Sequence, residues 1–145
     1  MVGSTDRATR RILLVDDDAD FTLSTTTLLE SQGYIVSTAR SAKEGLEKVL
    51  TDSPDLIVLD VMMEHESAGY QLNQALKFGP EFESFRRVPI LMVSSIPIDP
   101  ARRFQMAGEV EMVTPNSYLT KPVDIAAFLS EIRALLGEPS DLTQV

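Results

Sequence analysis

The sequence predicts an α/β domain built on a parallel sheet. Five short apolar segments alternate along the chain with stretches whose apolar residues recur at helical spacing. Three of these segments, Ile12–Val15, Leu56–Leu59 and Ile90–Val93, contain only aliphatic residues and methionine. Such runs without polar alternation are typical of strands that are buried on both faces. Strands and helices in alternation favour a parallel sheet with right-handed crossovers.

The first half of the chain supplies two strand–helix units. After Ile12–Val15, a helix is expected from Phe21 to Gln32, with Gly33 as its stop. Its four threonines are weak helix formers, so packing against the rest of the domain must stabilise it. The second strand is expected at Ile35–Val36 within Tyr34–Ala39. Ser41 followed by Glu44 forms a capping-box pattern that begins the next helix.

The central unit consists of the strand Leu56–Leu59 and a helix from about Tyr70 to Phe78. Gly79-Pro80 terminates this helix. The residues from Glu81 to Arg87 fit either a loop or an extra helical turn.

Two further units complete the pattern. The strand Ile90–Val93 precedes an N-cap and first-turn proline at Asp99-Pro100. The strand Tyr118–Leu119 precedes the most regular helix, Val123–Leu136, which Gly137 ends.

Length and composition limit the classes of function. The 145 residues suit one domain at about 11–137, between polar tails at 1–10 and 138–145. The second tail is either a true end or the start of a linker to something removed. Thirteen basic and 22 acidic residues give a net charge of −9, which argues against direct nucleic-acid binding.

The remaining composition excludes several kinds of site. Cysteine is absent and there is one histidine, so disulfides, thiolate sites and multi-histidine metal centres are excluded. No apolar run is long enough to cross a membrane, and the first ten residues lack the apolar core of a signal peptide. We expect a cytoplasmic protein without a membrane partner.

Polar residues follow four of the predicted strands. Asp16-Asp17, Asp60, Ser94-Ser95 and Lys121 stand where the first, third, fourth and fifth strands end. Because the carboxyl ends of parallel strands meet at one edge of a sheet, these groups should converge there. Carboxylate oxygens are suitable ligands for a hard cation such as Mg²⁺. A carboxylate beside the metal can also act as the nucleophile in phosphoryl transfer. A lysine and a hydroxyl can then stabilise the phosphoryl oxygens.

These motifs together resemble the receiver domain of two-component response regulators. The matching segments are ILLVDDD at 12–18, PDLIVLDVMM at 54–63, VPILMVSS at 88–95 and YLTKPVD at 118–124. They occur in the family's order and span residues 11–136. The resemblance implies a flavodoxin-like, three-layer, doubly wound (βα)5 fold, with a five-stranded parallel sheet in the order 2-1-3-4-5.

The resemblance also implies a phosphoacceptor and a metal site. Asp60 resembles the residue that accepts a phosphoryl group from a histidine kinase or a histidine phosphotransfer protein. Asp17, Asp60 and the backbone carbonyl of Met62 resemble the direct ligands of Mg²⁺, for which Mn²⁺ could substitute. Asp16 resembles the second acidic residue, which positions the metal through water.

Further positions resemble the switch machinery of the family. Ser94 matches the hydroxyl that moves to the phosphoryl group. Lys121 matches the lysine that pairs with a phosphoryl oxygen, and Pro122 follows it across a peptide bond that is cis in the family. Tyr118 matches the aromatic switch residue, and Ser95 matches a position kept small for entry of the donor.

Two apolar positions bear on the lifetime of the phosphorylated form. In the family, the residues two past the phosphoacceptor and two past the switch hydroxyl tune this lifetime. Here they are Met62 and Ile96, which cannot orient an attacking water, so slow self-dephosphorylation is expected. The domain is expected to catalyse only its own phosphorylation and dephosphorylation, and not to be a metabolic enzyme.

The expected output surface combines the helix after Asp99, the strand Tyr118–Leu119 and the helix Val123–Leu136. Its downstream effector, or an output domain removed from this chain, is not identified by the sequence. The cognate kinase and the stimulus are not identified either, and a homodimer is left open.

Two segments depart from the family pattern. The 64–69 loop lacks the usual proline, looks one residue longer and adds Glu64 and Glu66, while the 96–117 segment is about five residues longer. These departures motivate an alternative, a receiver-like interaction module that works without phosphorylation. A Mg²⁺ phosphohydrolase is disfavoured, because position 62 is methionine and no Asp-x-Asp pair follows the nucleophile.

Each residue singled out also has a plainer interpretation. Asp16-Asp17 could only cap a helix, as Asp18 is expected to do, and Asp60 could be a turn residue. Ser94 could be a strand-end hydroxyl, Tyr118 a core residue and His65 an exposed loop residue.

Overall fold

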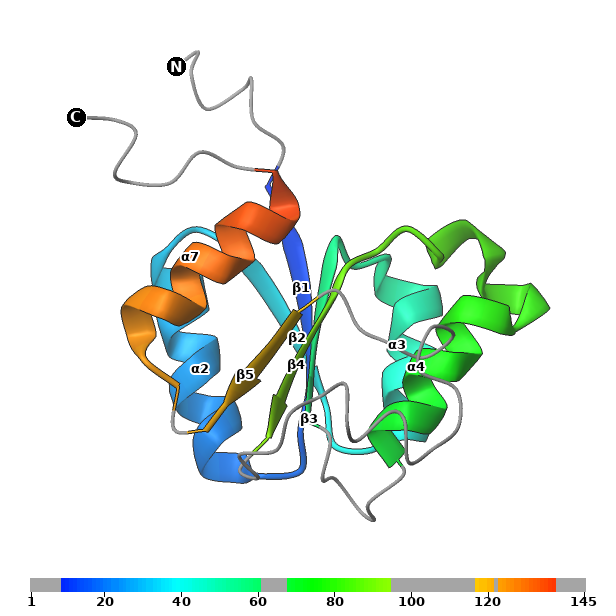
Figure 1. The fold of residues 1–145 in the computed structure, drawn as a ribbon, viewed down its shortest axis with the longest axis horizontal. Helices are drawn as coiled ribbons and strands as arrows, with labels where there is room; N and C mark the ends of the chain where they lie inside the picture. Colours follow the sequence, from blue (N-terminus) through cyan, green and yellow to red (C-terminus); the bar gives the residue numbers. More distant parts are fainter. Residues whose placement is uncertain (1–8, 61–67, 95–116, 122, 138–145) are drawn as a thin grey trace.

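The computed structural model describes residues 9–60, 68–94, 117–121 and 123–137. Within them the chain forms a five-stranded parallel sheet in the order β2-β1-β3-β4-β5, which confirms the predicted fold class (Figure 1). The strands are β1 (Arg11–Val15), β2 (Ile35–Ala39), β3 (Leu56–Asp60), β4 (Ile90–Ser94) and β5 (Ser117–Thr120). The helices are α2 (Ala19–Ser31), α3 (Ala42–Asp52), α4 (Ala68–Phe78), the 3-10 helix η1 (Pro80–Phe85) and α7 (Ile125–Leu136).

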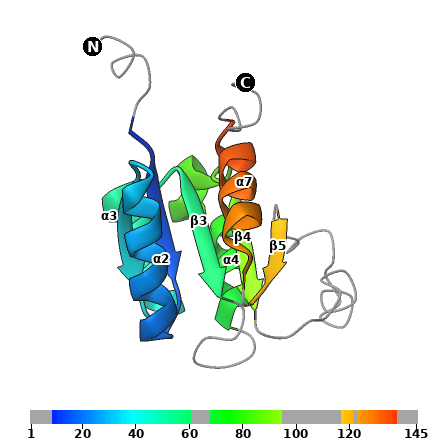
Figure 2. The same cartoon turned by 90° about the vertical axis from the view of Figure 1, so that its left-hand side faces the viewer.

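The helices cover the sheet on two sides, which gives three layers. Helices α2 and α7 lie on one face, and α3 and α4 lie on the other (Figures 1 and 2). Residues 12–15 of β1 and 56–59 of β3 have no exposed surface, because both faces of these strands are covered. This burial confirms the interpretation of the purely aliphatic segments.

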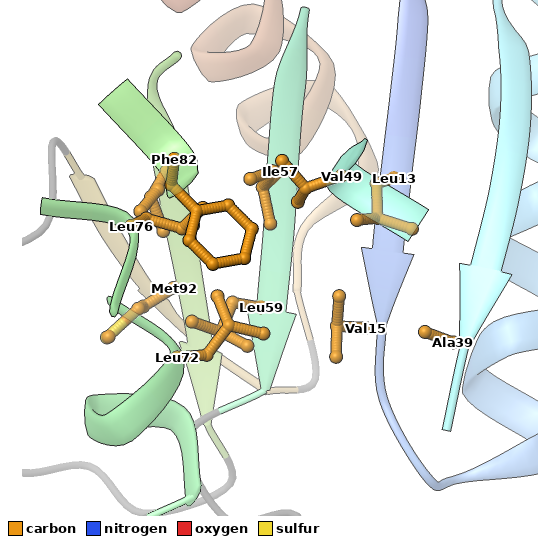
Figure 3. Close-up of a cluster of buried hydrophobic side chains, with 11 residues drawn as sticks. Leu13, Val15, Ala39, Val49, Ile57, Leu59, Leu72, Leu76, Phe82 and Met92 are labelled. Carbon is orange, nitrogen blue, oxygen red and sulfur yellow. The ribbon is translucent and has the colours of Figure 1, made fainter. Parts of the chain in front are cut away.

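Alternate side chains of the strands form two separate cores. On the side of α3 and α4, Leu13 and Val15 pack with Val49, Leu72 and Phe82 (Figure 3).

On the side of α2 and α7, Ile12 and Leu14 pack with Leu29, Phe128 and Ile132. Both cores stabilise the central strands, and these strands carry the polar residues at their carboxyl ends.

Side chains cap the helices that start at this edge of the sheet. The carboxylate of Asp18 accepts hydrogen bonds from the backbone N–H groups of Asp20 (3.0 Å) and Phe21 (3.2 Å), which confirms its capping role. Because of this cap, α2 begins two residues earlier than predicted. The hydroxyl of Ser41 accepts from the N–H of Glu44 (3.0 Å), as the capping-box pattern predicts.

The segment after α4 forms a short 3-10 helix rather than a loop. Pro80 occupies its first turn, and Phe82 within it is buried. This finding settles the alternative that the sequence left open for Glu81 to Arg87. The helix expected to begin at Asp99-Pro100 lies outside the described residues.

None of the described helices is both long enough and apolar enough to cross a membrane.

Candidate functional site

Three aspartates meet at the carboxyl end of the two central strands. Asp16 and Asp17 follow β1, and Asp60 is the last residue of β3. The register pairs Val15 with Leu59, so the next residue of each strand lies at the same level. One carboxylate oxygen from each aspartate lies within 4.8 Å of the others.

These three carboxylates differ in their exposure. Asp16 is 1% exposed and Asp60 is 5% exposed, whereas Asp17 is exposed at the mouth of the site. A buried carboxylate is costly unless it is paired. Asp16 and Asp60 therefore need opposite charge close by.

Lys121 brings that charge from the end of β5. Its ammonium donates to Asp16 Oδ2 at 2.8 Å and lies 3.9 Å from Asp60 Oδ2. The ammonium also lies 4.1 Å from the centroid of the Phe21 ring, a distance at which a cation–π contact is favourable. Only 14% of the lysine side chain is exposed. Lys121 is thus held between an aromatic ring and two carboxylates.

Asp16 is fixed by its backbone as well as by its side chain. Its Oδ1 accepts from the backbone N–H of Asp18 (2.9 Å), and its own N–H donates to the carbonyl of Ala39 (2.9 Å). The hydroxyl of Thr22 donates to its carbonyl oxygen at 3.4 Å. Both carboxylate oxygens of Asp16 thus have protein donors, and capping alone does not account for its pairing with a lysine 105 residues away.

The charges of the site do not balance. Among the described residues named above, the three carboxylates and the one ammonium carry a formal charge of −2. Two carboxylate charges within 4.8 Å of each other repel by at least about 3.5 kcal/mol at an effective dielectric constant of 20. Clustered carboxylate oxygens are the donors that a hard divalent cation prefers. The donor set therefore fits a hard divalent cation.

The structure places two more predicted site residues by their backbone. Ser94 is the last residue of β4 and Tyr118 lies in β5, in a register that pairs Ser94 with Thr120. Both therefore belong to strands that end at the edge where the aspartates lie. The predictions for Met62, Ser95, Ile96 and Pro122 fall outside the described residues.

Sequence reasoning missed two residues that contact this site. Phe21 and Thr22 lie in the first turn of α2, directly beyond the Asp18 cap. One feature of the sequence could have predicted them. A helix that starts at this edge of the sheet brings the residues of its first turn beside the strand ends.

The fold and the site define a class of doubly wound parallel α/β proteins with an acidic site at the carboxyl ends of the strands. Comparison with known families is more specific. The model of the response regulator receiver domain matches residues 12–133. The chain belongs to this family, and receiver domains are signalling domains of two-component systems that interact with histidine kinases and effectors.

Individual relatives agree with this assignment. The chain is 26% identical to the polar-differentiation response regulator DivK of Brucella ovis, over 90% of this chain and 98% of the relative. It is similar to the solved receiver domain of a signal transduction histidine kinase from Syntrophus aciditrophicus, with 29% identity, a TM-score of 0.73 and coverage of 89% and 91%.

A receiver domain of a sensor histidine kinase from Pseudomonas aeruginosa PAO1 has the same fold, with 23% identity and a TM-score of 0.75. The match covers 90% of this chain and 100% of that domain, whose structure has a magnesium ion coordinated in the active-site cleft.

Proposed function

We propose that this receiver is a Mg²⁺-dependent phosphorylation switch whose phosphoacceptor is Asp60. The observation that carries the proposal is the setting of this carboxylate. It is 5% exposed, has two further carboxylates within 4.8 Å and has an ammonium at 3.9 Å. A nucleophilic carboxylate, a cation site and a lysine are the parts that phosphoryl transfer through an aspartyl phosphate needs.

The proposed donor is a phosphohistidine on a histidine kinase or a phosphotransfer protein. A carboxylate oxygen of Asp60 forms a bond to phosphorus while the P–N bond of the donor breaks, and the bonding pair stays on the imidazole nitrogen. The ammonium of Lys121 is close enough to offset negative charge on the transferred group. Mg²⁺, or Mn²⁺ in its place, supplies the remaining positive charge when it is bound.

The carboxylates divide the work of holding the ion. Asp17 and Asp60 are the proposed direct ligands from side chains, with the backbone carbonyl of Met62. Asp16 is proposed to act through water, and the two protein donors on its carboxylate oxygens support this division.

Phosphorylation would change the contacts of Lys121. An aspartyl phosphate carries a charge of about −2 where the free carboxylate carries −1, and its phosphoryl oxygens offer the ammonium acceptors that compete with Asp16. Lys121 directly follows β5, and α7 begins four residues later. We therefore propose that the signal passes through β5, with Ser94 and Tyr118 as switch residues, to the surface formed with α7 and the helix after Asp99.

The remaining expectations belong to the same proposal. Residues 11–137 form the receiver between the tails 1–10 and 138–145, and the domain catalyses only its own phosphorylation and dephosphorylation. A downstream effector or an output domain reads the altered surface. Partnership with a kinase that uses cellular ATP favours the cytoplasm as its location.

Phosphoryl incorporation tests the proposal directly. With acetyl phosphate and MgCl2, intact mass should increase by one phosphoryl group in the wild type and in Asp18→Asn, but not in Asp60→Asn. Asp18→Asn removes a neighbouring carboxylate, and asparagine caps a helix as well as aspartate does. Absence of the modification in the wild type would instead favour the module that works without phosphorylation.

A further inference from the structure

A second surface lies on the opposite side of the sheet from α2 and α7. A groove of about 420 Å³ runs between α3, α4 and η1. Its apolar lining comes from Leu46, Leu50, Leu72 and Phe82, and Leu50 is 47% exposed. Helices α3 and α4 stand side by side in Figure 1, across the sheet from α2 and α7. The proposed phosphorylation chemistry uses none of these side chains.

The wall that η1 contributes is fixed by its own hydrogen bonds. The N–H of Gly79 donates to the carbonyl of Ala75 at 2.7 Å, and the N–H of Phe82 donates to the carbonyl of Gly79 at 3.0 Å. The Arg86 guanidinium donates to the same Gly79 carbonyl at 3.1 Å. A Cβ at position 79 would lie 2.7 Å from the Ala75 oxygen, so only glycine fits there.

These contacts place Phe82, 4% exposed, under the groove, where it packs in the core with Leu72 and Leu76 (Figure 3). A wall formed in this way needs no ordering when it binds a ligand, which favours affinity.

The dimensions and walls of the groove suit a helix. The lining residues of α3 run from Ala42 to Leu50, a rise of about 12 Å or two helical turns. An extended peptide would need backbone partners, but these walls are helices whose backbone groups are bonded internally. An amphipathic helix bonds its own backbone and would present apolar residues at i, i+4 and i+7 to this groove.

Charges at the two ends of the groove favour one orientation of a bound helix. Helices α3 and α4 both connect parallel strands of one sheet, so they run in the same direction and end at the same side. Lys43, in the first turn of α3, and Glu81, in η1 after α4, therefore lie at opposite ends of the groove. Glu47 lies one turn along α3 from Lys43 and adds negative charge to the lining.

We propose that this groove binds one amphipathic helix of a partner protein, with basic residues in its first turn and acidic residues in its last. The first turn of the bound helix lies at Glu81 and its last turn at Lys43. In this orientation the positive end of its dipole and its basic residues face Glu81, and the negative end and its acidic residues face Lys43. A second copy of this chain fits less well, since a two-fold interface would place the same concave surface on both sides.

A defined peptide library tests this occupant. Helical peptides of about 16 residues carry Leu, Ile, Met, Phe or Val at i, i+4 and i+7, and either Lys or Glu in the first and last turns. They are selected on the full chain, and binding is measured by fluorescence anisotropy. Selection should yield peptides with Lys first and Glu last, which bind about three- to tenfold more tightly than their charge-reversed partners.

Matched variants locate the binding surface. Leu50→Asp should weaken binding at least tenfold, whereas Leu23→Asp, at a leucine 69% exposed on α2, should leave it unchanged. The double variant Lys43→Glu with Glu81→Lys should reverse the charge preference of the peptides. Unchanged far-UV circular dichroism establishes that each variant is folded.

Three results would overturn the proposal. The first is that no selected peptide binds more tightly than about 100 µM. The second is that binding is indifferent to Leu50→Asp or to the charge exchange. The third is that the chain dimerises with concentration and Leu50→Asp abolishes the dimer, which would assign the groove to a second copy. None of these results depends on phosphoryl transfer to Asp60.

Discussion

Asparagine in place of Asp17 removes one of the three clustered carboxylates and keeps the size of the side chain. Asp17 is exposed, so its repulsion from Asp16 and Asp60 is close to the value in water, about 1 kcal/mol for each pair at a separation within 4.8 Å. Loss of attraction to Lys121 offsets part of this relief. Without a divalent cation, Asp17→Asn should therefore raise the free energy of unfolding by about 1 kcal/mol.

Magnesium should reverse the order of stability. At a free concentration ten times the dissociation constant, Mg²⁺ stabilises the wild type by about 1.4 kcal/mol, or about 3–6 °C in Tm. If losing a direct ligand weakens binding about a hundredfold, the same concentration stabilises Asp17→Asn by less than about 0.1 kcal/mol. The variant is then more stable than the wild type without Mg²⁺ and no more stable with it.

Thermal unfolding in MgCl2, compared with KCl at equal ionic strength, measures both effects, because the second salt reports screening alone. Asp18→Asn is the matched control, since it removes the next carboxylate along the chain and retains the cap. It should keep the full gain from magnesium. If Asp17→Asn keeps more than half of that gain, or Asp18→Asn loses as much of it, the assignment of Asp17 as a metal ligand is wrong.

Three further predictions concern Lys121, Gly45 and the aspartyl phosphate. Lys121→Met should lower the free energy of unfolding by about 2 kcal/mol, because it leaves Asp16 buried without its ammonium. In an Asp16→Asn background the same change should cost less than about 1 kcal/mol. Equal losses in the two backgrounds, measured by urea denaturation, would show that the two residues are not coupled. Gly45→Ala should destabilise the chain by about 1 kcal/mol despite better helix propensity, because the new Cβ would lie 2.9 Å from Leu72 Cδ1; a higher Tm would contradict this packing. The aspartyl phosphate should persist for minutes or longer, because Met62 and Ile96 are apolar, and a half-life of seconds, followed by loss of the label, would refute that expectation.

The sequence predicted the sheet well because its strands carry a strong signal. A strand buried on both faces must be apolar throughout, as Ile12–Val15 and Leu56–Leu59 are, and few other structures need such short aliphatic runs. Helix starts were predicted well where a capping side chain marks them, as at Ser41. The predicted start of α2 is two residues too late, although the sequence also predicts a capping role for Asp18.

The turn after α4 could not be decided from sequence, because its conformation depends on contacts and not on propensity. The approach of Gly79 to Ala75 and the burial of Phe82 determine it. The sequence offers only a glycine, a proline and several charged residues at this place, which also fit a loop.

Part of the candidate site could be predicted from the sequence and part could not. The strand ends predicted which residues meet there, because parallel strands deliver their carboxyl ends to one edge. The particular pairing of Lys121 with Asp16 at 2.8 Å, and its contact with the Phe21 ring, depend on packing between side chains that are 105 and 100 residues apart in the sequence. Spacing patterns in a sequence relate residues within one helix, strand or turn, so they do not predict contacts between such distant residues.

Chemical mapping of the phosphorylated carboxylate tests most directly whether Asp60 is the phosphoacceptor. The chain is phosphorylated with acetyl phosphate in MgCl2, reduced with borohydride, which converts an acyl phosphate to homoserine, and analysed by peptide mass spectrometry. Conversion is expected at position 60 alone, and it should be lost when EDTA removes the metal. Conversion at Asp16 or Asp17, or equal conversion in EDTA, would contradict this role of Asp60.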